Sequence, residues 1–354
     1  MSNDFVFNER KYKKIHIIQN TDDNAGFSAL ITYTLNGIRK ALENDWLPVV
    51  NFDKNNTPLF YDPAHGENVW EYFFDPIGGA SYSQVQAWLA EGLISDAMLH
   101  SYSAAEIFGM HLEDPDRVAP FWAWDKPKSP AQWMAEKRKL GRRYVNSYVK
   151  VKPPILEKAS SFQKKYYINK YIIGVHIRGT DFAYAEPTSV SDYFSAIHSH
   201  LKSSQINDFK LFLATDQAQY VELFQQEYKD KLMYYNVARS DDHIPPFHLD
   251  NISGYKKGED VLLDILLLSR CNFLFKGAAA VGEYALWFNP NLDSHDFALT
   301  SDFVHIRYSL RKSAFLKMDI GNQGFIRVKF LTAVQLLKQL VTEAKVIIKK
   351  YFPL

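Results

Sequence analysis

Residues 172–181 read IIGVHIRGTD, and this stretch decides the fold of the second half of the chain. Its four β-branched apolar residues are typical of a strand that a parallel sheet buries on both faces. His176, Arg178 and Asp181 come at or just after the point where such a strand would reach the surface. Ligands of open α/β sheets bind just outside the carboxyl ends of the strands. The stretch therefore predicts a parallel α/β sheet with a polar site at the end of this strand.

Arg178 is the first candidate binding residue. A guanidinium at a strand end suits phosphate, because its rigid fork donates two parallel hydrogen bonds. The alternative is a structural ion pair between Arg178 and Asp181 that closes the strand, since such pairs also gather at strand ends. This segment alone leaves both interpretations open.

Length and composition describe an ordinary globular protein. With 354 residues the chain exceeds the size of one growing hydrophobic core, so we expect two domains. Lys and Arg number 41 against 40 Asp and Glu, which gives no electrostatic drive toward nucleic acid. Cys271 is the single cysteine, which excludes an intrachain disulfide and fits a reducing compartment. No signal peptide is recognisable and no apolar run approaches the ~20 residues that span a bilayer, so we expect a cytoplasmic protein.

The spacing of apolar residues predicts strands and helices that alternate in both halves. A strand, a helix and a second strand are expected over 14–19, 27–42 and 47–52, and we place the domain joint near 165–170. Further strands are expected over 171–177, 209–214, 232–235 and 272–275, and further helices over 83–91, 95–108, 133–148, 153–165, 190–202, 217–227, 260–269, 279–288 and 331–350.

Asp264 is the second informative residue, because it interrupts an apolar helix in which an unpaired carboxylate is rarely buried. A carboxylate at the edge of a base pocket accepts two parallel hydrogen bonds, from N1–H and the 2-amino group of guanine. Adenine offers no such pair of donors. The alternative is a carboxylate that pairs or caps within the core.

Two turns of very small residues are candidate phosphate loops. Residues 275–280 read FKGAAA and lead from a strand into a helix, so the backbone amides near Ala279 and Ala280 could approach an anion. Residues 24–28 read NAGFS and form a similar turn, with Gly26 and Phe27 at its centre. The alternatives are plain helix packing for the first turn and helix capping for the second.

The ordered set of motifs resembles the fucosyltransferase superfamily that carries a His-x-Arg-x-x-Asp motif. Its members include nodulation-type and core α-1,6-fucosyltransferases and the protein O-fucosyltransferases. Residues 176–181 match that motif, 213–216 match a strand that ends in Ala-Thr-Asp, and 263–281 match an aspartate helix followed by a strand and small residues. Residues 24–28 look like the family's N-terminal phosphate loop. The likeness covers residues 14–290.

The resemblance implies a GT-B fold, in which two Rossmann-like domains face a cleft. Residues 1–167 would form the acceptor-side domain, on which a helix over 331–350 would pack back, and 168–330 would bind GDP-fucose. By motif position, Arg178 would hold the diphosphate, and His176 and Asp264 would contact the guanosine. Asp216 would support that pocket, and Asp181 would orient Arg178 or its loop.

The resemblance also implies an inverting, metal-independent glycosyltransferase that moves fucose from GDP-fucose to a glycan hydroxyl, with no cofactor. Arg178 and backbone amides would stabilise the charge that develops on the diphosphate. Glu186, ten positions after His176, corresponds to a glutamate proposed as the catalytic base in the core branch. The alternative for Glu186 is a solvated loop carboxylate.

One departure from the family keeps other functions open. Residues 278–280 are three alanines where the family usually carries a serine near the phosphates. A GT-B transferase for another nucleotide sugar and a catalytically silent glycan- or nucleotide-binding protein therefore remain alternatives. A bacterial-type cytoplasmic enzyme of polysaccharide biosynthesis is the better analogue, and its acceptors would include lipid-linked or nodulation-type oligosaccharides. Its basic C-terminal helix would then allow peripheral membrane contact.

Overall fold

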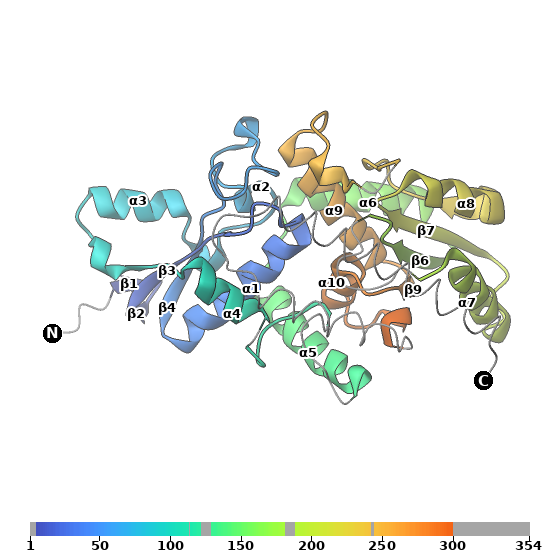
Figure 1. The fold of residues 1–354 in the computed structure, drawn as a ribbon, viewed down its shortest axis with the longest axis horizontal. Coiled ribbons are helices and arrows are strands. Elements are labelled where there is room, and N and C mark those ends of the chain that lie inside the picture. Colours follow the sequence, from blue (N-terminus) through green and yellow to red (C-terminus); the bar gives the residue numbers. More distant parts are fainter. Residues whose placement is uncertain (1–4, 113, 122–128, 181–187, 242–243, 300–354) are drawn as a thin grey trace, which may run out of the picture.

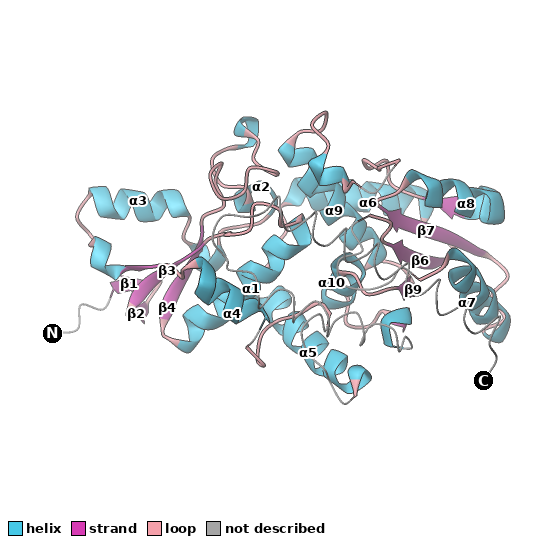
Figure 2. Ribbon diagram, viewed as in Figure 1, coloured by secondary structure: helices cyan, strands magenta, loops and turns pink. Residues whose placement is uncertain are grey.

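The computed structural model describes residues 5–112, 114–121, 129–180, 188–241 and 244–299. Two parallel β-sheets lie toward opposite ends of its long axis, and helices lie between and around them (Figures 1 and 2). The α/β fold class expected from the alternating pattern is thereby confirmed.

The first sheet has three parallel strands in the order β4-β3-β5. The chain runs through β3 (Lys14–Ile18), α1 (Phe27–Glu43) and β4 (Trp46–Val50), and returns much later as β5 (Leu99–His100). A two-stranded antiparallel hairpin, β1 (Phe5–Phe7) with β2 (Arg10–Tyr12), precedes it. The apolar residues of β3 explain its central place, because both of its faces are buried.

The second sheet has five parallel strands in the order β10-β9-β6-β7-β8. Their bounds are β6 (Tyr171–Ile177), β7 (Phe209–Thr215), β8 (Leu232–Met233), β9 (Phe273–Lys276) and β10 (Asp293–Asp296). The chain adds β7 and β8 on one side of β6 and then crosses to add β9 and β10 on the other side. The strand order thus reverses between β6 and β9, and this switch point is where open α/β sheets form a ligand crevice.

Alternate residues of β6 face two different helical layers. Ile173, Val175 and Ile177 pack with α7 (Val190–Ser203) and α8 (Ala218–Tyr228) in one hydrophobic cluster. Ile172 belongs to another cluster, with α9 (Gly254–Leu268) and α10 (Ala280–Phe288). His176 shares the face of Ile172, and its ring lies against Gly282 of α10. His176, a polar residue within an apolar strand, therefore faces the helical layer that contains α10, the helix that follows the small-residue turn.

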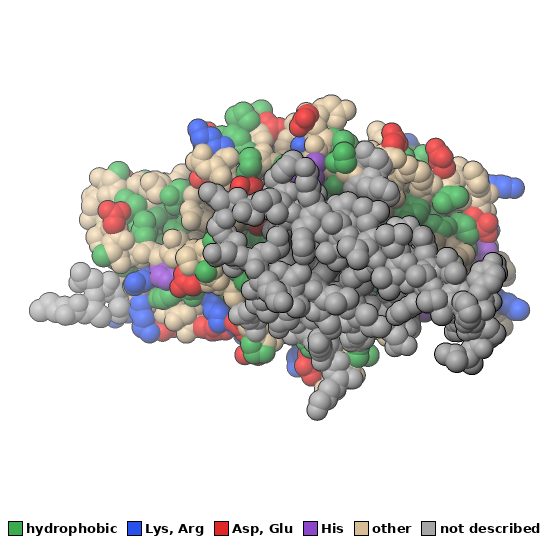
Figure 3. Space-filling model, in the orientation of Figure 1, with side chains coloured by type: hydrophobic (Ala, Val, Ile, Leu, Met, Phe, Trp, Pro, Cys, Tyr) green, Lys and Arg blue, Asp and Glu red, His purple; other side chains and the backbone are tan. Residues whose placement is uncertain are grey.

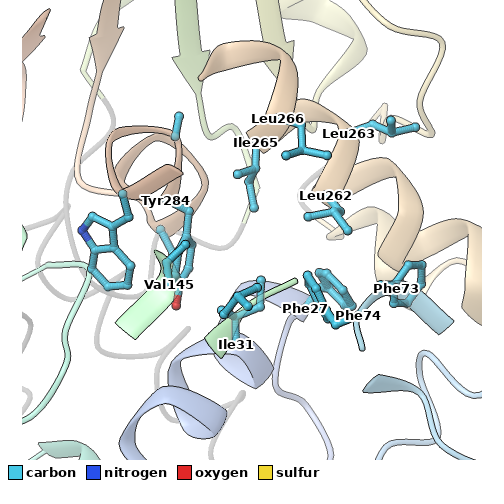
Figure 4. Packing of buried hydrophobic residues seen from close by; sticks show 14 of the residues in the cluster. Phe27, Ile31, Phe73, Phe74, Val145, Leu262, Leu263, Ile265, Leu266 and Tyr284 are labelled. Carbon is cyan, nitrogen blue, oxygen red and sulfur yellow. The ribbon is translucent and has the colours of Figure 1, made fainter. Parts of the chain in front are cut away.

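One hydrophobic core joins the two sheets. It contains residues of α1, α2 (Trp70–Phe73), α5 (Pro130–Tyr148), α6 (Pro153–Tyr166), α9 and α10. Figure 4 shows side chains of α1, α9 and α10 gathered in this core. Helices α5 and α6 pack on α10 and α9, although they precede the second sheet in the sequence. The domain division at 167/168 stays a prediction.

The expected helix over 95–108 is wrong. A 3₁₀ turn at Asp96–Met98 leads into β5, and only then does α4 (Ala104–Leu112) begin. Leu99 and His100 pair with Ile15 and His16 of β3, so backbone pairing with a buried strand overrides a local helical pattern. Helix α3 (Tyr82–Ala90) agrees with the expectation for 83–91. Short 3₁₀ turns complete the described elements: Pro63–His65, Ile77–Gly79, Lys229–Lys231, Pro246–His248 and Phe297–Leu299.

The surface shows no strong charge bias in the view of Figure 3. On its described part, acidic and basic side chains are interspersed. This distribution agrees with the near balance of 41 basic and 40 acidic residues.

Candidate functional site

The carboxyl edge of the second sheet at the switch point, called the crevice below, brings together two segments that the sequence analysis singled out. His176 of β6 lies opposite Lys276 of β9 in the parallel register. Beyond these residues, β6 continues into Arg178 and β9 continues through Gly277 into α10. Because the carboxyl ends of adjacent parallel strands meet at one edge, residues about a hundred positions apart line the same crevice.

Asp216 fixes the backbone after β6. It follows the last residue of β7, and its Oδ1 accepts a hydrogen bond from the Gly179 N–H at 2.6 Å. Its Oδ2 accepts from the Thr180 hydroxyl at 2.5 Å and from the Thr180 N–H at 3.4 Å. A Cβ at Gly179 would meet the side chain of Gln217, so a larger residue here would have to displace that side chain. Asp216 therefore supports the Arg178 loop, and these bonds position Arg178 at the end of its strand.

Arg178 is half-buried at the mouth of the crevice. Its Nε donates to the Thr180 carbonyl at 3.4 Å, a long contact that holds the guanidinium near its own loop. The positive charge of Arg178 is also one of the causes that lower the pKa of the His176 imidazole. The guanidinium thus stands at the end of β6, with its loop clamped by Asp216.

His176 is a neutral imidazole. Its side chain is buried, and among the described residues no group forms a hydrogen bond with Nδ1. Burial, together with the charges of Arg178 and Lys276, lowers the pKa of His176 to about 3. Its backbone carbonyl accepts from the Tyr193 hydroxyl at 2.9 Å, which fixes the strand end. A buried ring nitrogen without a partner is unusual in a folded protein, and this one lies against the Gly282 position of α10.

Asp264 is also buried and incompletely paired. It lies in α9 with 8% of its surface exposed, and Oδ1 has no hydrogen-bond partner among the described residues. Burial raises the pKa of Asp264 to about 8. The charge of Arg239 counteracts this rise, whereas Asp260 adds to it. At neutral pH, Asp264 is therefore mainly a carboxylic acid, and the described residues supply no hydrogen-bond donor to its Oδ1.

Lys276 begins a buried ionic network that the sequence analysis missed. Its Nζ contacts Asp296 at 2.8 Å and Glu283 at 3.2 Å, with 1% of the residue exposed. Arg138 of α5 binds Glu283 through two hydrogen bonds, at 2.7 and 2.9 Å, and contacts Asp296 at 2.7 Å. Two cations and two carboxylates thus neutralise one another beside β9. The network fixes the start of α10 against α5.

The turn before α10 has the form expected of an anion-binding helix start. Ala279 is the N-cap residue, and no side chain caps the helix. The side chains of Ala279 and Ala280 are buried, so they pack in the interior and leave only backbone groups toward the crevice. The first N–H groups of a helix have no partner inside the helix and carry the positive end of its dipole.

The start of α1 lies beside α10. Gly26 is its N-cap residue, again without a side-chain cap. Phe27 packs edge-on against Phe73 with ring centroids 5.0 Å apart, so only its backbone N–H is available to a ligand. The Tyr284 hydroxyl of α10 donates to the Ser28 carbonyl at 3.1 Å, which joins the two helix starts. The structure therefore brings both small-residue turns to one region.

Three sequence-based predictions fall outside the described residues: Asp181, Glu186 and the helix over 331–350. Arg239, near the carboxyl end of β8, is a further charged residue at the crevice that the sequence analysis missed. No sequence pattern marks it, because its relation to Asp264 exists only in the folded chain.

The described residues contain no group of three or more His, Cys, Asp or Glu side chains arranged to hold a metal ion. Within the same part of the chain, none of the helices combines the length and the apolar character needed to cross a bilayer.

Comparison with known proteins gives structural neighbours only. No family model and no curated protein matches the sequence. Similar solved structures include NodZ alpha-1,6-fucosyltransferase co-crystallized with GDP, with 16% identity over 78% of this chain and 93% of that chain and a TM-score of 0.47. A variant of FUT1 from Arabidopsis thaliana in complex with GDP has 11% identity over 80% of this chain and 70% of that chain, with a TM-score of 0.44. POFUT1 in complex with GDP has 10% identity over 80% and 97% of the two chains, with a TM-score of 0.45.

Proposed function

We propose that the crevice binds the GDP part of a nucleotide sugar, and that the chain is a glycosyltransferase that moves fucose from GDP-fucose to a glycan hydroxyl. The observation that carries this proposal is the buried, unpaired Oδ1 of Asp264 in α9, whose charge interacts with that of Asp216 at the carboxyl end of β7. The ordered motifs that resemble the fucosyltransferase superfamily support the choice of donor.

Asp264 would recognise the base. An ionised carboxylate accepts from N1–H and the 2-amino group of guanine at once, whereas adenine and uracil present no such pair of donors. Leaving a buried acceptor without a partner costs about 1–3 kcal/mol. A guanine that supplies the missing donors would recover this cost, and a base that lacks them would not.

The diphosphate would lie at the end of β6. Arg178 would donate to it through its planar fork, and the Asp216 clamp would keep the fork in place. Backbone amides near Ala279 and Ala280, and near Gly26 and Phe27, would add donors at two helix starts. His176 would contact the guanosine as a neutral imidazole, without adding charge.

The reaction would invert the anomeric carbon. An acceptor oxygen would form a bond to C1 of fucose while the bond from C1 to the GDP oxygen breaks, and the hydroxyl proton would pass to a carboxylate. Glu186 would be that base, and Asp181 would orient the Arg178 loop. Arg178 and the helix amides would stabilise the negative charge that develops on GDP, without Mg²⁺. The glycan, lipid-linked or free, would bind on the side of residues 1–167.

Calorimetric titration with GDP, ADP and UDP tests the donor site. We expect GDP to bind at least tenfold more tightly than the other two, since Asp264 distinguishes them by two hydrogen bonds. Equal affinity for all three nucleotides would refute the proposal.

A transfer assay with Arg178→Ala tests the phosphate role. We expect the variant to lose transfer, while Arg143→Ala, which removes an exposed arginine of α5, keeps it. Full activity of Arg178→Ala would reject this role.

A second candidate function follows from the three alanines at 278–280, which leave backbone amides where the family usually offers a serine hydroxyl. Such a site could accept another nucleotide sugar, or bind one without reaction. A hydrolysis screen against a panel of nucleotide sugars distinguishes these cases. Slow hydrolysis of GDP-fucose alone supports the main proposal, and hydrolysis of none supports a silent binding protein.

A further inference from the structure

Buried polar atoms without partners gather around the crevice. Among the described residues, five buried side-chain nitrogen or oxygen atoms have no hydrogen-bond partner: Arg39 Nε, His176 Nδ1, Tyr228 Oη, Arg239 Nε and Asp264 Oδ1. Three of these five belong to β6, to α9 and to the segment after β8, the elements that border the crevice. Such atoms are rare in folded proteins, and each one calls for an explanation.

Arg239 is fixed at this place by its neighbours. Ser240 donates its N–H to the Asp216 carbonyl at 2.8 Å and accepts from the Ala218 N–H at 3.0 Å, so the segment after β8 is tied to the end of β7. The two terminal nitrogens of Arg239 donate to the Val237 carbonyl at 3.2 Å and to the Tyr235 carbonyl at 3.0 Å. The guanidinium carbon also lies 5.0 Å from the centre of the Tyr234 ring.

These contacts engage both terminal nitrogens of the guanidinium, whereas Nε–H has no partner among the described residues. The two bonds hold the arginine in one orientation while its buried Nε–H donor stays unused. A purely structural arginine would be expected to direct a buried Nε–H to a carbonyl or a carboxylate.

The nearest candidate carboxylate does not take that donor. The charges of Arg239 and Asp264 interact, yet among the described residues neither Arg239 Nε nor Asp264 Oδ1 has a hydrogen-bond partner. Asp260, one turn earlier in α9, is engaged with the Ala238 N–H at 3.0 Å and with Lys256. A buried donor and a buried acceptor, on two residues whose charges interact, are therefore both left without a partner.

We propose that Arg239 is a specificity-determining residue that donates through Nε–H to the O6 acceptor of a guanine base, beside the donors that Asp264 accepts. This inference rests on the proposed function, since it places the guanine of GDP between the two residues. Guanine presents an acceptor, O6, next to two donors, N1–H and the 2-amino group. Adenine carries an amino donor in place of O6, an acceptor at N1 and no 2-amino group. It would therefore satisfy Arg239 and Asp264 less completely.

The test compares GDP, inosine diphosphate and ADP by titration calorimetry, with Arg239→Lys as the variant. Lysine keeps the positive charge and can still donate to a carbonyl, but it has no Nε–H in a planar fork. We expect the variant to bind GDP and inosine diphosphate about tenfold more weakly, because both carry O6, while its affinity for ADP changes little. The GDP to ADP affinity ratio should therefore fall about tenfold.

Two controls separate recognition from folding. Arg143→Lys makes the same exchange at an exposed position of α5 and should leave all three affinities unchanged. Thermal unfolding of Arg239→Lys reports the loss of the contacts with Val237 and Tyr235. An unchanged GDP to ADP ratio in Arg239→Lys would overturn the inference, and so would an equal loss for all three nucleotides.

The outcome also distinguishes this inference from the proposal on which it rests. If the unmodified chain prefers GDP and Arg239→Lys keeps the preference, only the role of Arg239 is wrong. If the unmodified chain shows no preference for GDP, the proposed function itself fails and this inference fails with it.

Discussion

Proton release should accompany GDP binding, and its size follows from Asp264. Burial raises the pKa of this carboxyl to about 8, so in the ligand-free chain about nine tenths of Asp264 is protonated at pH 7. A guanine that donates twice requires the carboxylate. The ligand therefore binds the deprotonated form, and affinity must increase as the pH rises toward and through 8.

The expected change in GDP affinity with pH follows from that pKa. About 1% of Asp264 is ionised at pH 6 and about 90% at pH 9, so the Kd for GDP should fall about 90-fold between these values. This change corresponds to about 2.7 kcal/mol of binding free energy. The neighbouring charges have opposite effects on the pKa: Arg239 and Lys256 lower it, whereas Asp260 and Asp216 raise it.

The assay is titration calorimetry from pH 6 to 9 in pairs of buffers with different ionisation enthalpies. Phosphate groups with a pKa near ~6 titrate over part of this range, so a reference is needed. Asp264→Asn supplies it, because the amide keeps an acceptor oxygen and does not titrate. We expect about 0.9 proton to be released at pH 7 by the unmodified chain beyond the value for Asp264→Asn. Identical pH profiles for the two proteins would refute the reasoning, as would an affinity that falls with pH.

Three further outcomes are expected. Asp264→Asn should raise the melting temperature of the ligand-free protein, and more at pH 8 than at pH 4. The reason is that the carboxyl loses its proton near pH ~4 in the unfolded chain but keeps it to about pH 8 in the folded chain, so ionisation favours unfolding between these values. Equal melting temperatures of the two proteins at both pH values would contradict this prediction. Glu186→Gln should lower the turnover number roughly 100-fold while calorimetry shows unchanged GDP affinity, and full turnover would remove Glu186 from the mechanism. Gly141→Leu should lower the free energy of unfolding in urea by about 1–3 kcal/mol, because a side chain there collides with the Trp287 indole of α10, and an unchanged value would mean that α5 does not need this close approach.

The central strand of the second sheet was predictable because its environment leaves a local mark. A strand covered on both faces must be apolar along its length, and β6 is buried from Ile172 to Ile177. The polar residues that follow it then identify the carboxyl edge. The structure brings His176, Arg178 and Asp216 to one edge, because parallel strands bring their carboxyl ends together, and the binding roles of these residues stay predictions.

Strands β5 and β10 were not predictable, because their residues carry no local pattern of a strand. Strand β5 is two residues long, too short to show any period, and β10 reads DSHD, a polar edge strand with no apolar pattern. Both strands exist because a neighbouring strand offers backbone hydrogen-bonding groups. Pairing of this kind depends on residues far away in the sequence, so a local pattern does not reveal it.

The charged residues of the site escaped prediction for the same reason, because the side chains that they contact lie far away in the sequence. Arg138 is 145 residues from Glu283 and 158 from Asp296, so nothing in the neighbourhood of any of these residues announces the network. Arg239 lies in a segment without regular structure, and its significance comes from a donor left over after its other bonds are made. Sequence reasoning finds residues that a motif marks, whereas the fold alone identifies those that meet across it.

The shared core bears on how the crevice works. Helix α1 of the first sheet packs against α9 and α10 of the second in one continuous hydrophobic cluster, and Tyr284 bonds the two helix starts together. Burial of this kind is worth about 25 cal/mol for each Å² of apolar surface, so separating the sheets would require exposing that core to water. The donor and acceptor atoms around the crevice are thus held in place before a ligand arrives. On the proposed function, affinity would then depend on how completely a ligand satisfies Asp264 and Arg239, because little binding energy would be consumed in bringing these residues together.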